Sequence, residues 1–358
     1  MEPEKDEGKE CGMEIIHGGD IYRNRIWLDF SVNTNPLGCP DSLRRAVRNA
    51  ADRVEVYPDP AGMRVRARLA KLYGVKAENV LAGNGASELI TAVAHSVRPG
   101  RVLLTAPSFY GYERAVRGVS GCEIRWHQLR PEEGFAVTER FLDELTVETD
   151  LCYLCNPNNP TGVGLEHKLL RRIMERCEEQ EIDLIVDECF TELSEELTTV
   201  IPMIRDYRRL HILKAYTKVL AIPGVRFGFL ISGEENIERL EKALPEWNLS
   251  VFAEAAAIEG SKVLEKGEYI TNSLSLIEEE RRYLSAELEK LSVHVIPGVA
   301  DFLFLHSDRD LYRPLLERGI LIRDCSNYHG LERGYYRVAV RDHAANETLI
   351  RTLREVLH

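Results

Sequence analysis

Residues 151–162 read LCYLCNPNNPTG, an apolar run that passes directly into a turn rich in asparagine, proline and glycine. The run Leu151–Cys155 has the length of a buried strand, and the residues after it punctuate the chain as a turn. Cys152 and Cys155 have the spacing of a redox or metal motif, but on a strand their side chains point to opposite faces. We therefore interpret both as packing residues, because a free cysteine behaves as a small buried hydrophobe.

Polar residues stand at the ends of further apolar runs downstream. Asp187 closes one such run, Lys218 follows the next after a short turn, and Arg226 opens a third. Ligands of open α/β sheets bind outside the carboxyl ends of the strands, so these residues and Asn159 are expected to converge on one small molecule. An amide, a carboxylate, a lysine and an arginine suit pyridoxal 5′-phosphate (PLP). The lysine bonds its aldehyde, the carboxylate keeps the pyridine nitrogen protonated, and the arginine neutralises the phosphate.

Apolar stretches alternate as helix and strand from Asp41 onwards, which is the pattern of a mostly parallel sheet covered on both faces. The expected strands are residues 79–83, 101–105, 122–127, 151–155, 184–187, 210–213 and 227–231. Beyond residue 246 follow long helices, one carrying Leu276–Leu291, and strand-like pieces at 293–296, 302–306, 320–323 and 335–340. The charged run 278–282 is interpreted as a solvated helix face. The sequence thus predicts an α/β fold in three parts: an N-terminal arm over residues 1–40, a large PLP-binding domain over 41–245 and a smaller α+β C-terminal domain over 246–358.

The bulk composition limits the classes of partner. The 358 residues carry a formal net charge of −12, with 44% hydrophobic and 29% charged residues, as in an ordinary globular protein. The acidic balance argues against nucleic acid or an anionic membrane as the main partner. No stretch approaches the ~20 apolar residues of a membrane span, and the charged start Met1–Glu7 lacks the apolar core of a signal peptide. We therefore expect a cytoplasmic protein without membrane association and without a metal site.

Two further segments are typical of a phosphate and ring site. Residues 83–88, GNGASE, lie between an expected strand and an expected helix, where glycine lets the backbone approach an anion and the helix start offers free amides. Taken alone, this turn could equally be structural. The ring of Phe109 can stack on a pyridine ring, but taken alone its more common role is packing in the core or a loop. The stronger local signal is Lys218 with Arg226 eight residues later, separated by residues 221–224, AIPG.

Taken together, these motifs resemble a known family. The residues that carry the resemblance are HGG at 17–19, LDFSVNTNPLG at 28–38, AIPGVR at 221–226, ILIR at 320–323 and YYRVA at 335–339. The chain resembles fold-type I PLP-dependent enzymes of the aspartate aminotransferase superfamily, in the branch that holds histidinol-phosphate aminotransferases and L-threonine-O-3-phosphate decarboxylases. The resemblance covers the chain from His17 to the C-terminus and implies the fold-type I architecture.

The resemblance implies a role in cofactor binding at each matching position. Lys218 would form the Schiff base with PLP and shuttle protons, Asp187 would pair with the pyridine nitrogen, and Asn159 would bond the ring hydroxyl. Phe109 would stack on the ring. The cofactor phosphate would be held by Gly85, Ala86, Ser87, Thr217 and Arg226, with Tyr57 reaching across from the second subunit of a homodimer that shares its active sites.

The same resemblance implies how a small phosphorylated amino acid would be bound. Arg337 would receive the substrate carboxylate, and Arg323, Asn33 and His17 would receive the substrate phosphate, although His17 could equally be structural. Two positions depart from many aminotransferases. Phe190 stands where a tyrosine often bonds the ring hydroxyl, and Ala215 stands where a phosphate-binding Ser or Thr is common, which removes one charge-assisted bond.

The residues leave the reaction open, because PLP can drain electrons from any bond at the α-carbon and the protein selects the bond by orientation. The resemblance favours decarboxylation of L-threonine O-3-phosphate to (R)-1-amino-2-propanol O-2-phosphate, the linker unit of cobalamin. The alternatives are an aminotransferase acting on histidinol phosphate, and a decarboxylase acting on L-serine O-phosphate. A non-enzymatic PLP-binding module is a further alternative, against which the intact Lys218, Asp187 and Arg226 speak.

Overall fold

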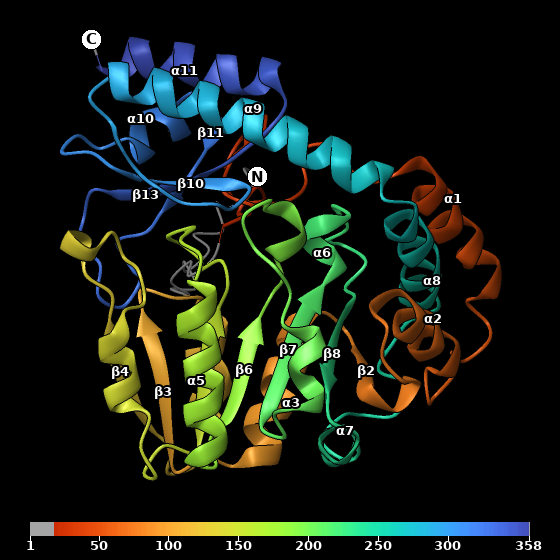
Figure 1. The fold of residues 1–358 in the computed structure, drawn as a ribbon. Coiled ribbons are helices and arrows are strands. Elements are labelled where there is room, and N and C mark those ends of the chain that lie inside the picture. Colours follow the sequence, from red (N-terminus) through yellow and green to blue (C-terminus); the bar gives the residue numbers. More distant parts are fainter. Residues whose placement is uncertain (1–17, 358) are drawn as a thin grey trace, which may run out of the picture.

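The strands expected in the first two thirds of the chain form one seven-stranded sheet in the computed structural model, which describes residues 18–357 (Figure 1). The strand order is β2-β8-β7-β6-β5-β3-β4. Strand β8 runs antiparallel to both neighbours and every other pair is parallel, which confirms the predicted mostly parallel sheet. The strands are β2 (Val80–Gly83), β3 (Arg101–Ala106), β4 (Glu123–Gln128), β5 (Leu151–Cys155), β6 (Asp183–Asp187), β7 (Leu210–Ala215) and β8 (Gly228–Ser232).

The central strands are buried on both faces. Every residue of β5, β6, β7 and β8 is buried, which explains why they read as continuous apolar runs. In β5, Cys152 and Leu154 join one apolar cluster, whereas Tyr153 and Cys155 join another on the opposite face. The interpretation of the two cysteines as packing residues is therefore confirmed.

Helices supply the two covering layers of the large sheet. One cluster includes side chains of α2 (Met63–Tyr73), α5 (His167–Glu179) and α8 (Val251–Lys266), and α1 (Asp41–Ala50) packs on α8. The other includes side chains of α3 (Ala86–Val97), α4 (Tyr110–Arg117) and α7 (Glu234–Glu241). Short 3-10 helices occupy Ala51–Arg53, Ala77–Asn79, Pro131–Glu133, Glu139–Glu144, Thr191–Leu193 and Ile201–Arg205.

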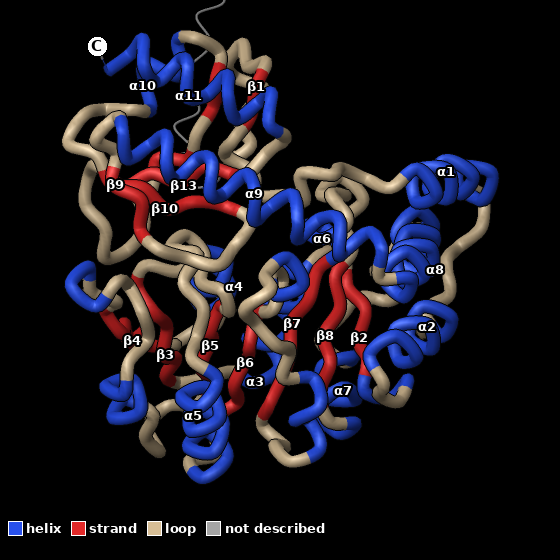
Figure 2. The backbone as a smooth tube through the Cα atoms, turned by 45° about the horizontal axis from the view of Figure 1, so that its top comes forward, coloured by secondary structure: helices blue, strands red, loops and turns tan. Residues whose placement is uncertain are grey.

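A smaller antiparallel sheet forms from the C-terminal third, which confirms the second sheet expected there. Its order is β12 (Arg323–Asp324), β13 (Tyr335–Ala339), β10 (Phe302–His306) and β9 (His294–Ile296). Helices α9 (Glu268–Lys290), α10 (Tyr312–Glu317) and α11 (His343–Leu357) cover the side of it that faces away from the large sheet (Figures 1 and 2). A two-stranded parallel pair of β1 (Leu28–Asp29) and β11 (Ile320–Leu321) joins the N-terminal segment to this part of the chain.

The arrangement of the two sheets sets where a ligand can bind. The carboxyl ends of the parallel strands of the large sheet point toward the small sheet (Figure 1). Figure 2 shows β10 and β13 of the small sheet lying beyond these strand ends. The structure therefore places the expected ligand region between the sheets. No helix among residues 18–357 is both long and apolar enough to cross a membrane.

Two expectations from the sequence are corrected. The single strand expected at 320–323 is broken at Ile322, because β11 pairs with β1 whereas β12 pairs with β13 in the other sheet. The charged run in α9 is only partly solvated: Glu280 is 2% exposed and bonds Asn346 at 2.8 Å, and Arg281 donates to the carbonyl of Ala300 at 3.0 Å. The helical period places both residues on the inner face.

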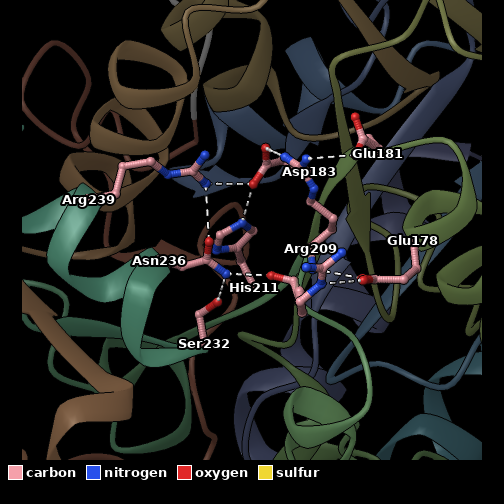
Figure 3. A network of polar contacts seen from close by, with 9 residues as sticks. Glu178, Glu181, Asp183, Arg209, His211, Ser232, Asn236 and Arg239 are labelled. Carbon is pink, nitrogen blue, oxygen red and sulfur yellow. Dashed lines mark hydrogen bonds and ion pairs between the residues drawn. The ribbon is translucent and has the colours of Figure 1, made fainter.

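A buried charge network closes the opposite edge of the large sheet, at the start of β6 (Figure 3). Asp183 is 2% exposed and accepts hydrogen bonds from His211 at 2.7 Å, Arg239 at 2.7 Å and Arg209 at 3.3 Å. Burial raises the pKa of this carboxyl, but the hydrogen bonds and charges of His211 and Arg239 outweigh it and lower the pKa to about 2. Asp183 is therefore an ionised anchor that joins the starts of β6 and β7 to α7.

Replacing this anchor tests the network. Asp183→Asn leaves two arginines without their shared anion, so we expect urea denaturation at pH 7 to show a loss of about 2–4 kcal/mol in the free energy of unfolding. Because the folded pKa lies below the unfolded one, the carboxylate's contribution is complete above pH ~4 and fades as the pH falls toward 2. The variant should lack this part of the acid sensitivity.

Glu181→Gln is the matched control, because its side chain is 78% exposed and approaches Arg209 only at 3.9 Å. We expect it to change the free energy of unfolding by less than ~0.5 kcal/mol. Equal stability of Asp183→Asn and the unaltered chain would contradict the account of the anchor.

Candidate active site

Lys218 lies in α6 (Tyr216–Val219), one short turn beyond the end of β7. Its Nζ is 5.7 Å from the centre of the Phe190 ring. The backbone N–H of Asn35 donates to the carbonyl of Lys218 at 3.0 Å, which joins the N-terminal segment to this helix. Burial, and next the charge of Arg337, lower the pKa of the Lys218 amine. A lowered pKa makes the neutral amine available to bond an aldehyde.

Asp187 ends β6 as a buried carboxylate. The hydroxyl of Tyr112 donates to it at 2.6 Å and the backbone N–H of Cys189 donates at 3.0 Å. Burial raises the pKa of Asp187, and the hydrogen bonds from Cys189 and Tyr112 oppose the rise. The Tyr112 ring meets the ring of Phe109 edge-on at 5.5 Å between centres. Tyr112 thus contacts both Asp187 and Phe109 and connects these two predicted site residues.

The start of α3 and the loop before β8 form an anion cradle. Gly85 has φ +80°, and a Cβ there would lie 2.5 Å from Nη2 of Arg226. A Cβ at Gly228 would lie 2.7 Å from the backbone N of Ala86. The two glycines therefore let the Arg226 guanidinium lie against the first turn of α3, whose amides no side chain caps. Helix-end amides beside an arginine suit a phosphate.

Two other residues predicted to bind the phosphate lie in α3 and α6. Ser87 follows Ala86 in the first turn of α3 and is exposed. Thr217 precedes Lys218 in α6 and is 6% exposed. Ser87 therefore lies in the helix that forms the anion cradle, and Thr217 lies in the helix that carries Lys218.

Arg337 and Asn159 are brought into direct contact across the two sheets. Arg337 is 6% exposed, donates Nη1 to the side-chain oxygen of Asn159, and donates Nη2 to the carbonyl of Ser31 at 2.7 Å. Its guanidinium lies 5.4 Å from the ring centre of Phe302. Nε of Arg337 and the side-chain oxygen of Asn33 are buried without a protein partner. Buried polar atoms of this kind call for a ligand or water.

Arg323 lines a neighbouring hollow. It donates Nη2 to the side-chain oxygen of Asn327 at 2.7 Å and lies 5.1 Å from the ring centre of Tyr328. A cavity of about 410 Å³ lies between this segment and the start of α4. Its lining includes Phe109 from the large domain and Arg323 from the small one, but not Lys218. The cavity is therefore a neighbour of the lysine and not its immediate surroundings.

Tyr57 stands apart from these residues. It is 77% exposed, and its ring lies 5.1 Å from the ring of Trp247. Other apolar side chains near it in sequence are also exposed, including Val54, Val56 and Met63. His17, the other predicted residue not placed with the group, lies outside the described residues.

The sequence analysis missed two polar residues of the site. Tyr112 bonds Asp187, and Asp301 is a fully buried acid at the start of β10. A signal was present for each. Tyr112 lies one helical turn after Phe109, and Asp301 borders the apolar run 302–305, which is the criterion that singled out Asp187.

The arrangement fits PLP on the chemistry of its own side chains. It offers a buried amine of lowered pKa, a buried carboxylate, and an arginine beside free helix-end amides. Within residues 18–357, no group of three or more His, Cys, Asp or Glu side chains could hold a metal ion.

Comparison with known proteins agrees with this chemistry. Residues 25–353 match the family described as aminotransferase class I and II. The threonine-phosphate decarboxylase of Salmonella typhimurium is 39% identical over 354 residues, which cover 95% of this chain and 96% of the relative.

Two solved structures extend the comparison to the fold. The histidinol-phosphate aminotransferase from Clostridium acetobutylicum has a TM-score of 0.85 at 30% identity. The L-threonine-O-3-phosphate decarboxylase from Porphyromonas gingivalis has a TM-score of 0.81 at 25% identity. Each alignment covers 92% of this chain and 99% of the other. The likeness therefore spans both sheets.

A glycine substitution tests the anion cradle. In Gly85→Ala the new Cβ would displace the Arg226 guanidinium from the start of α3. Because one charged hydrogen-bonding group is worth about 1.5–3 kcal/mol, we expect PLP affinity to fall about 10- to 100-fold in a titration followed by absorbance.

Gly134→Ala is the control, because Gly134 also has a positive φ, +61°, but nothing lies within 4 Å of its Cβ position. It places a methyl group at a positive φ without touching Arg226, and its left-handed backbone (ψ 26°) strains alanine less than that of Gly85 (ψ 164°). Equal PLP affinities of the two variants would show that the cradle does not hold the phosphate.

Proposed function

Because the chain belongs to the aminotransferase class I and II family, whose members use PLP, we propose that it decarboxylates L-threonine O-3-phosphate. The product would be (R)-1-amino-2-propanol O-2-phosphate, the linker unit of cobalamin. The proposal draws on the 39% identity to a threonine-phosphate decarboxylase along nearly the whole chain. Such an enzyme needs separate cationic positions for a carboxylate and a phosphate, and Arg337 and Arg323 could supply them.

The observation that carries the proposal is the pairing of Arg323 with Arg337. The two residues are directly opposite each other on the antiparallel strands β12 and β13, so their backbones lie about 5 Å apart. Both are buried, at 7% and 6% exposure. Two buried arginines side by side suit a small dianionic substrate, because a guanidinium recognises a carboxylate or a phosphate through two parallel hydrogen bonds.

The residues of the cradle and strand ends would hold PLP. Arg226, Gly85, Ala86, Ser87 and Thr217 would hold its phosphate, Asp187 its pyridine nitrogen, and Asn159 its ring hydroxyl, with Phe109 against the ring. When bound, PLP withdraws electrons from the bonds at the substrate α-carbon. Tyr112 orients Asp187 by its hydrogen bond.

The remaining groups would bind and orient the substrate. Arg337 takes the carboxylate, and Arg323 with Asn33 takes the phosphate. The rings of Phe190 and Phe302 meet edge-on at 5.3 Å and form an apolar wall between Lys218 and Arg337. Such a wall disfavours a charged carboxylate relative to neutral CO2.

Two alternatives use the same machinery. Histidinol phosphate lacks a carboxylate, so an aminotransferase for it would leave Arg337 without its substrate partner. L-Serine O-phosphate differs from the proposed substrate by one methyl group, which is worth only about 1–3 kcal/mol in a pocket. The paired arginines suit the two anionic groups of either amino-acid phosphate, whereas an aminotransferase for histidinol phosphate would use Arg337 only for the carboxylate of its oxo-acid acceptor.

We also propose a cytoplasmic homodimer with shared sites. Tyr57 and the exposed Val54, Val56, Met63 and Trp247 form an apolar surface that a second copy would cover. Exposed groups of large apolar side chains of this kind mark interaction surfaces. Tyr57 would then reach the cofactor phosphate of the partner subunit.

A product assay tests the proposed reaction. Purified protein is incubated with PLP and L-threonine O-3-phosphate, without an oxo-acid acceptor, and CO2 and aminopropanol phosphate are both measured. We expect one CO2 for each aminopropanol phosphate formed. Amino transfer from histidinol phosphate to 2-oxoglutarate, with no CO2 from threonine phosphate, would instead identify an aminotransferase.

A further inference from the structure

Asp301 is a buried acid that none of the roles above uses. It stands immediately before β10, its exposure is 0%, and neither side-chain oxygen has a protein hydrogen-bond partner. Its backbone is fixed, because the N–H of Val340 donates to its carbonyl at 2.9 Å. A buried carboxylate without a hydrogen bond is costly, so its retention calls for a reason other than stability.

The contacts of the next residue and the charges that act on Asp301 link it to the reacting lysine. The next residue, Phe302, touches both Phe190, which lies under Lys218, and the guanidinium of Arg337. The cations that act on Asp301 are, in order of strength, Lys218, Arg337 and Arg281. Burial raises the pKa of Asp301 to about 6 against the pull of these cations, so it is ionised at pH 7 and above.

The two arginines near Asp301 donate to other groups. Arg281 donates to the carbonyls of Ala300 and Gly298. Arg337 donates from Nη1 and Nη2 to Asn159 and Ser31. Lys218, in contrast, makes no side-chain hydrogen bond or ion pair that the described structure shows. Because Nε of Arg337 has no protein partner, the charge of Asp301 acts on Arg337 as well, but it acts most strongly on Lys218.

The charges that face Lys218 come from four elements and act in opposite directions. Arg337 on β13 and Arg226 before β8 disfavour its ammonium form, as burial does. Asp301 before β10 favours that form, as does the thiol of Cys189 after β6 when ionised. Burial raises the pKa of the Cys189 thiol well above its usual value, so the thiol is neutral near pH 7. Asp301 is then the anion that opposes the two arginines.

The protonation state of Lys218 distinguishes the two reactions open to this site. Loss of CO2 breaks the bond between the α-carbon and the carboxyl carbon and leaves an electron pair on the α-carbon. A proton from the Lys218 ammonium forms the new C–H bond there, and water then restores the lysine proton. Amino transfer instead begins when a neutral Lys218 amine takes the proton from the α-carbon.

We propose that Asp301 is a positioning residue whose negative charge keeps the transferable proton on Lys218, and so directs the site toward CO2 loss and away from amino transfer. The proposal deepens the proposed function and rests on it for the identity of the substrate. Its physical part, the influence of Asp301 on Lys218, holds for any substrate.

The influence on Lys218 is measured without turnover. The nitrogen that joins Lys218 to PLP carries a proton whose loss changes the absorbance of the loaded protein, so a pH titration reports its midpoint. Removal of a neighbouring anion destabilises the protonated form, so Asp301→Asn should shift the midpoint downward by about 1 pH unit. Asp301→Glu, which restores the charge, should move it back toward that of the unaltered chain.

Asp308→Asn is the matched control, because it removes the same charge two residues beyond the other end of β10, where the side chain is exposed. Its midpoint should equal that of the unaltered chain. If Asp301→Asn does not fold, Asp301→Ser removes the same charge and leaves room for water. An unchanged or higher midpoint in the variant that lacks the charge would overturn the proposal.

The product ratio supplies the second measurement. With threonine phosphate, Asp301→Asn should give about tenfold more amino transfer per CO2 than the unaltered chain or Asp308→Asn, because a pKa lowered by 1 unit raises the ratio of neutral to protonated Lys218 tenfold. An unchanged ratio would overturn the role in reaction choice. A lowered midpoint combined with no CO2 from the unaltered chain would overturn the proposed function alone.

Discussion

The structure depends on holding ionisable groups out of water between two sheets. Asp187 ends β6, Lys218 follows β7 in α6, Asp301 precedes β10, and Arg337 lies within β13. Removing charges from water is expensive unless they are paired or hydrogen-bonded. The fully buried strands of the large sheet stabilise the fold and offset this cost. They also hold the groups at the carboxyl edge in fixed positions, where little water competes with a ligand. In such a setting each charge acts more strongly than it would in water.

The two edges of the large sheet show the difference between a structural and a functional use of charge. At the amino edge, both oxygens of Asp183 are bonded and its pKa is lowered. Facing the carboxyl edge from the start of β10 in the small sheet, Asp301 has no side-chain hydrogen-bond partner and its pKa is raised. A carboxylate whose two oxygens are both bonded fixes its strand, whereas an unbonded carboxylate leaves binding capacity for a small molecule. The same sheet therefore supports stability at one edge and chemistry at the other.

The strands and the polar residues at their ends could be predicted from the sequence, because these features depend on residues that are close together in the chain. Apolar runs located the strands, and polar residues at their ends located Asp187 and Lys218. The contact of Arg337 with Asn159 joins residues 178 positions apart and depends on how the two sheets pack, so local patterns could not reveal it. Predicting that Glu280 is buried would have required knowing which face of α9 packs inward. The proposed role of Tyr57 depends on a second copy of the chain. Asp301 was missed although its setting resembles that of Asp187.

The central claim is that Lys218 is the residue that bonds PLP at the junction of the sheets. Borohydride reduction of the PLP-loaded protein followed by peptide mass spectrometry tests it directly. Lys214 is a demanding competitor, because it lies four residues earlier, is 2% exposed, and pairs with Glu188 at 3.0 Å and Glu192 at 2.8 Å. The account predicts the cofactor label on Lys218 alone. A label on Lys214, or on a surface lysine, would contradict it.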